Sequence, residues 1–267
     1  MATHTDARPR NRLLSALPAA ELRVLEPHLE RVDLPRGHLL HAADGPIESI
    51  WFPETGVISL RVTPRCGGAA DIGTVGREGF VGHAVLFGDM TSIVEALAQV
   101  PGTALCLPTA VFQAALARDG EFRRLVSRSA RAFFLQVALV AACNRLHTAE
   151  QRMARWLLMT HDRVGADELL LTHELLAEML GATRSTATLA LGALQRAGLV
   201  RTAWGQITVV DRAGLESASC ECYGATCTEY ERLLGSSAGP PAHSQRGTRR
   251  QRRNGHMSST GTERISH

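Results

Sequence analysis

The sequence contains no lysine, because all 29 of its basic residues are arginine. Codon bias of the genome explains this absence without any functional reason. No uninterrupted apolar run approaches the ~18 residues that a membrane span needs, so we expect no transmembrane segment. The first twelve residues include basic side chains with no apolar stretch behind them, which argues against a secretory signal. A cytoplasmic protein is therefore expected.

The sequence also lacks any pattern that indicates catalysis. Ser59, Ser92 and Ser127 have no Gly-x-Ser-x-Gly context, and no base–nucleophile pairing accompanies Asp71 or Glu78. Several histidines are present, but their mutual spacing builds no metal site. These are His38, His41, His83, His147, His161 and His173. We therefore expect neither an enzyme nor a bound cofactor.

The cysteines fall into two groups along the chain. They are Cys66, Cys106, Cys143, Cys220, Cys222 and Cys227. The first three stand among apolar residues and are interpreted as buried thiols. The last three form C-x-C-x4-C, which is not a common spacing for zinc or an iron–sulfur cluster. We predict no metal site, while a metal or redox role of the last three stays open as an alternative.

The charge of the chain is unevenly distributed. Residues 236–267 contain six arginines and one acid, Glu263, so this segment has a net charge of +5 and the rest of the chain −2. The segment is rich in Ser, Gly, Pro and Arg, which predicts a disordered basic tail. Its arginine cluster at 249–253 either adds non-specific phosphate contacts or is solvated without a role. The sequence favours neither alternative.

The first half of the chain has the sequence pattern expected of a β-barrel. Short apolar segments alternate with Gly, Pro and Asp turn signals such as Asp44-Gly45, which predicts a jelly roll (double-stranded β-helix). The expected strands cover 32–34, 39–41, 47–52, 57–62, 69–75 and 93–107. Before them, Leu22, Leu25 and Leu29 recur at helical spacing behind Pro18 and predict an amphipathic helix.

A long helix is expected from about residue 121 to 146. Its segment 132–143 is apolar on nearly every side, and such a helix must be covered on more than one face. One face can lie on the barrel, and the other then requires a partner. We predict a homodimer through this helix; the alternative is a central helix within a monomer.

The residues after the long helix predict a helix-turn-helix. Thr172 can cap a helix that ends at Gly181, and Thr183 can cap a second helix that ends at Gly198. Two helices joined by so short a turn, with a glycine in it, are typical of this motif. Upstream, the segment 148–151 has the form of a capping box and begins a further helix.

Two short alternating segments, 199–202 and 206–210, follow the second helix and predict a β-wing. The fold class is therefore α+β. The expected domains are a sensor barrel over 12–118, the dimerisation helix over 119–147, a winged helix-turn-helix over 148–219, a cysteine-containing helical extension over 220–235 and the tail over 236–267.

The outward start of the second helix is the predicted DNA-reading surface, because recognition helices contact base edges mainly with their N-terminal residues. Arg184 is expected to make a bidentate contact to guanine, worth about 1–3 kcal/mol of discrimination. Its neighbours are expected to make weaker base or phosphate contacts. The predicted DNA-binding residues are Thr172, Thr183, Arg184, Ser185, Thr186, Thr188, Leu189, Arg201, Trp204 and Gly205.

Over about residues 12–235 the chain resembles the CRP/FNR superfamily of transcription regulators. The strongest matches are LTHELLAEMLGATRSTATLALGALQRAGLV and WGQITVVDRAGLE, and PRGHLLHAADGPIESIWFPETGVISL resembles the family's barrel. CECYGATCTEYERLL resembles the ending of a subgroup. The resemblance implies a homodimer on a two-fold-symmetric DNA site, with half-sites about one helical turn apart. RNA polymerase is then a candidate partner.

GREGFVG looks like the glycine-rich stretch where barrels of this family bind a phosphate. The resemblance therefore implies a candidate effector pocket at Gly79, Phe80, Val81, Gly82 and His83.

The chain departs from the family pattern at both sites. Ser185 and Leu189 stand where better-known members have glutamate and arginine, so their base preference does not transfer; Leu189 suits a thymine methyl group. In the barrel, His83 replaces a ribose-binding glutamate, and residues 78–117 contain no cation. A phosphate buried without a cation is costly, so we predict no cyclic AMP or GMP binding of the familiar kind. Backbone amides alone remain an alternative holder of a phosphate.

The iron–sulfur cysteines of the oxygen-sensing members are also missing, so the effector is unknown. Three functions stay open from the sequence. The first is a DNA-binding regulator that responds to an unidentified signal. The second is a small-molecule sensor whose ligand gates DNA binding. The third is an interaction scaffold with a vestigial wing, against which Arg184 argues.

Overall fold

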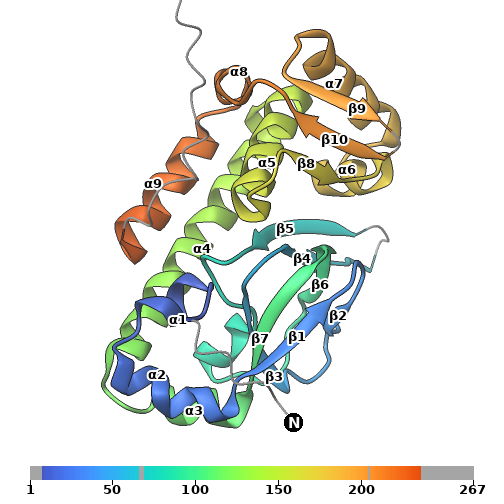
Figure 1. The fold of residues 1–267 in the computed structure, drawn as a ribbon. Helices are drawn as coiled ribbons and strands as arrows, with labels where there is room; N and C mark the ends of the chain where they lie inside the picture. Colours follow the sequence, from blue (N-terminus) through green and yellow to red (C-terminus); the bar gives the residue numbers. More distant parts are fainter. Residues whose placement is uncertain (1–7, 66–68, 204, 236–267) are drawn as a thin grey trace, which may run out of the picture.

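The computed structural model describes residues 8–65, 69–203 and 205–235. A β-barrel occupies one end, the long helix α4 runs beside it, and a small helical domain with its own sheet lies at the other end (Figure 1). Cys66, Trp204 and the predicted tail at 236–267 lie outside the described residues. Within these, the α+β fold expected from the sequence is confirmed.

Two antiparallel sheets form the barrel. The first has the order β1-β7-β3 and the second the order β2-β6-β4-β5. In chain order the strands are β1 (Glu30–Leu34), β2 (Leu39–His41), β3 (Ser49–Pro53), β4 (Val57–Val62), β5 (Ala70–Val75), β6 (Glu95–Val100) and β7 (Gly102–Pro108). Ile58 and Val75 of the second sheet and Ala104 of the first belong to one hydrophobic cluster and are at most 1% exposed. The sequence therefore packs as the predicted jelly roll.

One expected strand is wrong. The segment 93–107 is not continuous, because β6 and β7 belong to different sheets and the chain changes sheet between Val100 and Gly102. At that crossing a Cβ on Gly102 would overlap the carbonyl oxygen of Thr55. Only glycine permits this close backbone approach, and an apolar run gives no sign that it crosses from one sheet to the other.

Short helices flank the barrel, and most of them pack with α4 against β3 and β7 in one hydrophobic cluster. They are α1 (Arg12–Ala16), α2 (Ala19–Leu25), η1 (Glu26–His28), η2 (His83–Phe87) and α3 (Thr109–Leu116). Helix α1 was not predicted. Asn11 caps it, and its buried amide also donates to the carbonyl oxygens of Pro53 and Gly79, each at 2.9 Å. A buried amide with these partners ties the N-terminal segment to two barrel loops.

Helix α4 (Glu121–Leu146) has the predicted bounds. Its buried residues face the barrel or the C-terminal part of the chain, where Ala132 packs with Tyr230, whereas Phe134 and Leu146 are 70% and 74% exposed. By length and composition α4 is the one helix in the described ranges that could cross a membrane, which is weak evidence because helices of soluble proteins pass the same test. It packs against the barrel strand β5 and against α9 (Cys222–Leu234).

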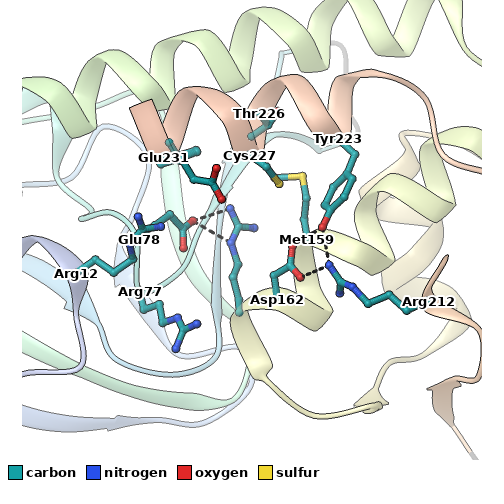
Figure 2. Close-up of a pocket in the computed structure, with 12 residues that line it drawn as sticks. Arg12, Arg77, Glu78, Met159, Asp162, Arg212, Tyr223, Thr226, Cys227 and Glu231 are labelled. Atoms are coloured by element: carbon teal, nitrogen blue, oxygen red, sulfur yellow. Dashed lines mark hydrogen bonds and ion pairs between the residues drawn. The ribbon is translucent and has the colours of Figure 1, made fainter. Parts of the chain in front are cut away.

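A buried ion pair joins the barrel to the helices. Arg163, near the end of α5 (Ala149–Val164), lies 2.7 Å from Glu78 and also donates to the carbonyl oxygen of Thr74 at 3.0 Å. The amide of Gln136 on α4 donates to the same carbonyl at 2.9 Å. Figure 2 shows Glu78 beside this junction, below α9. Barrel, α4 and α5 therefore meet through one polar network.

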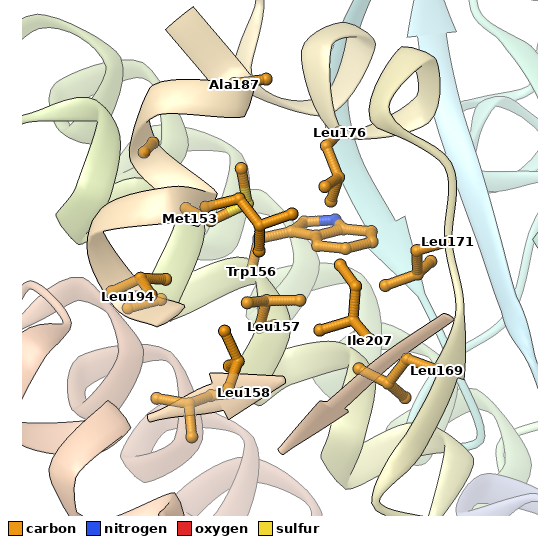
Figure 3. Packing of buried hydrophobic residues seen from close by; sticks show 14 of the residues in the cluster. Met153, Trp156, Leu157, Leu158, Leu169, Leu171, Leu176, Ala187, Leu194 and Ile207 are labelled. Atoms are coloured by element: carbon orange, nitrogen blue, oxygen red, sulfur yellow. The ribbon is translucent and has the colours of Figure 1, made fainter. Parts of the chain in front are cut away.

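The remaining elements form the second domain. They are β8 (Glu168–Leu170), α6 (His173–Leu180), α7 (Arg184–Arg196), β9 (Val200–Ala203), β10 (Gln206–Val209) and α8 (Arg212–Ala218). Trp156 of α5 lies at the centre of their core, close to Leu176, Leu171 and Ile207 (Figure 3). The sheet order is β8-β10-β9, so the wing contains a third strand that was not expected from the sequence.

The two halves are in direct contact. Val57 and Val100 of the barrel belong to the hydrophobic core of the second domain. Arg61 of β4 forms an ion pair with Glu178 of α6 at 3.0 Å, and Arg36 donates to Thr172 at 3.2 Å. These contacts hold the first helix of the helix-turn-helix against the sheet.

Candidate nucleic-acid interface

Two threonine caps orient the helix-turn-helix. The Thr172 hydroxyl accepts from the amide of Leu175 at 3.3 Å, and the Thr183 hydroxyl accepts from that of Thr186 at 3.2 Å. Gly181, at φ +55°, ends α6 in the left-handed region. Both caps and the glycine stop are confirmed as predicted. They fix the start of α7 at a defined angle to α6.

The inner face of α7 is buried through Ala187, Ala190, Leu191 and Leu194. The predicted base-reading residues therefore point outward. Arg184 is 70% exposed in its side chain and forms an ion pair with Glu174 at 2.9 Å. An exposed pair of this kind contributes at most about 1 kcal/mol, so Arg184 can exchange Glu174 for another partner at small cost.

The hydroxyl groups beside Arg184 form a connected cluster. The Thr183 oxygen lies 2.8 Å from that of Ser185 and 2.9 Å from that of Thr186. Thr188 lies 3.0 Å from Nδ1 of His173, a residue that was not among the predicted contacts. His173 is the first residue of α6 and so lies beside the Thr172 cap. The structure thus brings most predicted DNA-binding residues together at one end of α6 and α7.

Two predicted contacts lie elsewhere on this surface. Leu189 is 68% exposed, one helical turn beyond Ser185. Arg201 is exposed on β9, and Gly205, at φ +76°, lies in the turn of the wing. The Thr202 hydroxyl donates to Gln195 of α7 at 2.9 Å, which attaches the wing to the recognition helix. Trp204 lies outside the described residues.

The glycine-rich segment of the barrel is packed rather than open. Phe80 and Val81 are fully buried, and Val81 exchanges backbone hydrogen bonds of 2.8 and 3.1 Å with Trp51. A Cβ on Gly82, at φ +113°, would overlap the side chain of Ile50. The His83 ring stacks on Phe133 of α4, with ring centres 4.4 Å apart. The amide of Gly79 donates to the carbonyl oxygen of Gly76 at 3.0 Å, within the same glycine-rich segment. The effector pocket that the sequence predicts at residues 79–83 stays a prediction.

The stacked His83 should make folding sensitive to pH. Burial lowers its pKa to about 3, so the folded protein favours the neutral ring, whereas the unfolded chain takes up a proton below about pH 6.5. The neutral His83 ring therefore contributes to the free energy of unfolding in full above about pH 6.5, and this contribution is lost as the pH falls from 6.5 towards 3. Because part of the residue touches solvent, we expect about 1–2 kcal/mol of loss at pH 5.

Urea unfolding at pH 7.5 and pH 5.0 measures this loss. The His83→Phe variant should lose about 1–2 kcal/mol less than the wild type between the two values. The matched variant His28→Phe, at an exposed position, should behave as the wild type. Equal losses in wild type and His83→Phe would contradict the assignment.

A polar pocket lies where the barrel, α5 and α9 meet (Figure 2). Arg212 bridges Asp162 and the hydroxyl of Tyr223, each at 2.7 Å, and that hydroxyl donates to Asp162 at 2.8 Å. Arg12 and Arg77 also line it. This pocket was not predicted from the sequence, because its residues come from segments far apart in the chain.

Four residues of the described ranges could hold a metal ion together. The ligand atoms of Cys143, His147, Cys220 and Cys222 all lie within 4.8 Å of one another. Cys227, the third cysteine of the C-x-C-x4-C pattern, lines the polar pocket instead. Cys143 is buried, as expected from the sequence, whereas Cys106 is only half-buried. The spacing of Cys143 and His147, four residues apart near the end of a helix, was the signal available in the sequence.

Models of known protein families match both the barrel and the second domain. A family model described as the Crp-like helix-turn-helix domain matches residues 151–218, and the cyclic nucleotide-binding domain model matches residues 31–119. The transcriptional regulatory protein btr of Bordetella pertussis is 26% identical over 219 residues, which are 75% of this chain and 86% of that protein.

Solved structures show the same fold. A CRP-family transcriptional regulator from Thermus thermophilus matches with a TM-score of 0.58 at 20% identity, covering 78% of this chain and 97% of that one. FixK2 from Bradyrhizobium japonicum matches with a TM-score of 0.59 at 16% identity, covering 72% and 98%. With the cyclic nucleotide-binding domain model and the Crp-like helix-turn-helix model each matching one part of the chain, the chain belongs to the CRP/FNR superfamily of transcription regulators.

Proposed function

We propose that this protein binds a two-fold-symmetric DNA site as a homodimer, reads bases with the start of α7, and responds to a signal other than cyclic AMP. The observation that carries the proposal is the exposed, threonine-capped start of α7 with Arg184 on it. A cytoplasmic location and contact with RNA polymerase follow as parts of the same proposal.

The position of Arg184 supports an anionic or hydrogen-bond-accepting partner. It is the first residue of α7, whose first turn contains no acid. A cation at a helix N-terminus opposes the helix dipole, at a cost of about 0.3–1 kcal/mol. Stability alone would therefore disfavour arginine here. Guanine offers the O6 and N7 acceptors that match a guanidinium in the major groove.

The uncovered face of α4 supports a dimer. Phe134, Ala138, Ala142 and Leu146 recur at every fourth residue and all are exposed. Such a row forms a ridge that packs between side chains of a neighbouring helix. We infer that a second copy of α4 covers this row of exposed residues, because a dimer formed in this way also brings two recognition helices to one DNA duplex.

Independence from cyclic AMP is supported by the barrel interior. Arg163, a buried cation at the glycine-rich segment, is already paired with Glu78, and the half-buried Arg77 of that segment lines the polar pocket instead. His83 fills the space between the rings of Phe80 and Phe133, 4.5 and 4.4 Å away. A cyclic nucleotide phosphate would have to be buried there without a free cation, which is costly. Millimolar cyclic AMP should leave both the melting temperature and the DNA affinity unchanged.

Replacing Arg184 by alanine should remove the preference for one base pair in each half-site. The loss is about 1–3 kcal/mol of discrimination, or roughly 5- to 150-fold at that position. Binding-site selection from a random DNA library, run on wild type and variant, measures it. A selected sequence that is unchanged in Arg184→Ala would refute the assignment.

Arg201→Ala is the matched control, since it removes the same charge from the exposed wing. It should weaken binding to all DNA sequences alike. The slope of log affinity against log salt concentration should become shallower by about 1, the amount expected for one lost phosphate contact. The selected base preferences should stay those of the wild type.

A small-molecule effector that gates DNA binding is the second candidate function. The polar pocket of Figure 2 favours it, because it lies between the barrel, α5 and α9. A ligand that moved these elements would act on the contacts of Arg36 and Arg61 with the helix-turn-helix. Site selection repeated with and without metabolites from a cell extract tests this: ligand-dependent affinity supports it, and equal affinity excludes it.

A further inference from the structure

Two pairs of metal-binding side chains meet at the end of α4. Cys143 lies in the last turn of α4 and His147 is its C-terminal cap, so both project from one side of the helix. Cys220 and Cys222 flank the junction between α8 and α9, where Cys222 is the first residue of α9. The three cysteines are buried, at 0%, 3% and 4% exposure, in a cluster of their own.

Two of the distances between ligand atoms match one small cation, and all of them are within 4.8 Å. The sulfurs of Cys143 and Cys220 are 3.5 Å apart, and the Cys222 sulfur lies 3.8 Å from Nδ1 of His147. A tetrahedral zinc ion with bonds of about 2.3 Å to sulfur and 2.0–2.1 Å to nitrogen requires ligand separations of about 3.5–3.8 Å. A [4Fe–4S] cluster would need its cysteine sulfurs farther apart, because each of its ligands binds a different iron.

The imidazole of His147 is oriented as in a metal site. Its other nitrogen, Nε2, lies 3.2 Å from a carboxylate oxygen of Glu221, the residue between the two cysteines. If Nε2 carries the hydrogen, Nδ1 presents its lone pair to the cysteine sulfurs. Carboxylates hydrogen-bonded to metal-binding histidines fix the ring in this way.

The charge of the surroundings also suits such an ion. Three thiolates and one Zn²⁺ leave a net charge of −1. Arg155 of α5 is 8% exposed, its charge acts on all three thiols, and its Nε has no hydrogen-bond partner among the described residues. A buried arginine without a carboxylate partner is costly, and an anionic metal centre would compensate it.

We propose that Cys143, His147, Cys220 and Cys222 bind one Zn²⁺ in a closed Cys₃His site. Four protein ligands leave no open position for water, which is typical of structural rather than catalytic zinc. Binding releases the thiol protons and replaces them by the metal. The ion ties the end of α4 to the start of α9, and so fixes the helical extension beside the link to the DNA-binding domain.

The full chain, purified under reducing conditions without chelator, is analysed for metal by mass spectrometry. We expect one zinc per chain, and a cobalt-substituted protein with the absorption of tetrahedral thiolate coordination. Cys143→Ser and Cys222→Ser should lose the metal, whereas Cys227→Ser, five residues further along the same extension, should keep it. His147→Cys should also keep it, because a thiolate can replace the imidazole.

A titration of wild-type protein against a chromophoric chelator gives the zinc affinity without relying on any variant. Glu221→Ala should lower that affinity by about 10- to 100-fold. Four outcomes would overturn the proposal: wild-type protein that binds neither zinc nor cobalt, metal retained in Cys143→Ser and Cys222→Ser, iron with acid-labile sulfide at these residues, or a Cys143–Cys220 disulfide that persists under reductant.

Discussion

Replacing Phe134 by glutamate should convert the protein into a monomer that binds a palindromic DNA site at least about 100-fold more weakly. Phe134 is the largest side chain on the uncovered ridge of α4 and is 70% exposed in the single chain. Glutamate would bring two carboxylates into the contact between two copies of α4. Without the dimer, each recognition helix binds alone, and linking two binding units strengthens binding by about 10²- to 10⁴-fold.

Sedimentation and a DNA-binding titration measure both effects. Phe87→Glu is the matched control, since Phe87 is also an exposed phenylalanine, at 84%, but stands on the barrel in η2 rather than on α4. That variant should remain dimeric and bind with wild-type affinity. A Phe134→Glu protein that stays dimeric would show that the copies associate through another surface, or that α4 is the central helix of a monomer.

Replacing Arg163 by alanine should lower the free energy of unfolding by about 3–5 kcal/mol. Removing one partner of a buried ion pair leaves an uncompensated charge, and Glu78 is only 8% exposed. Burial raises the pKa of the Glu78 carboxyl, but the charge and hydrogen bonds of Arg163, together with backbone amides such as that of Gly76, outweigh burial and hold that pKa below its usual range. In the variant only the backbone amides still oppose burial. The amide of Gln136 and the carbonyl of Thr74 also lose a partner.

Urea unfolding at pH 7 measures this loss. Arg123→Ala, at an exposed position on α4, is the control and should cost no more than about 0.5 kcal/mol. The double variant Arg163→Met with Glu78→Gln removes both charges and should recover a large part of the loss. A change below about 1 kcal/mol in Arg163→Ala would show that the ion pair contributes little to the junction of barrel, α4 and α5.

The local features of this fold could be predicted because each depends on a few adjacent residues. Thr148, Thr172 and Thr183 cap their helices in the structure as their spacing predicts. Gly181 and Gly198 lie at the helix ends with positive φ. A hydroxyl that satisfies an unpaired amide, or a residue without a Cβ in a left-handed turn, acts within one turn of helix. The bounds of α4 likewise depend on residues close in sequence, since the helix begins after Gly120 and ends before His147.

Features that join distant segments were missed. The strand change between Val100 and Gly102 depends on a carbonyl from residue 55, and β8 becomes a strand only by pairing with β10. The C-x-C-x4-C pattern is continuous in sequence, yet it divides between the metal-binding cluster and the polar pocket. Cys143 and Cys220 are 77 residues apart in the sequence. The spacing of residues along the chain does not reveal which residues that far apart will meet in the fold.

The sequence by itself determined where the helices from α4 to α7 begin and end, that a helix-turn-helix follows a β-rich domain, and that Arg184 stands at the start of the second helix. These follow from periodicity and capping, which act over a few residues. Only the tertiary structure decided that Arg163 meets Glu78, that His83 stacks on Phe133 of α4, and that Cys143 and His147 lie beside Cys220 and Cys222. Such contacts arise when packing of apolar faces brings separate segments together, and side-chain packing is specified in three dimensions rather than along the chain.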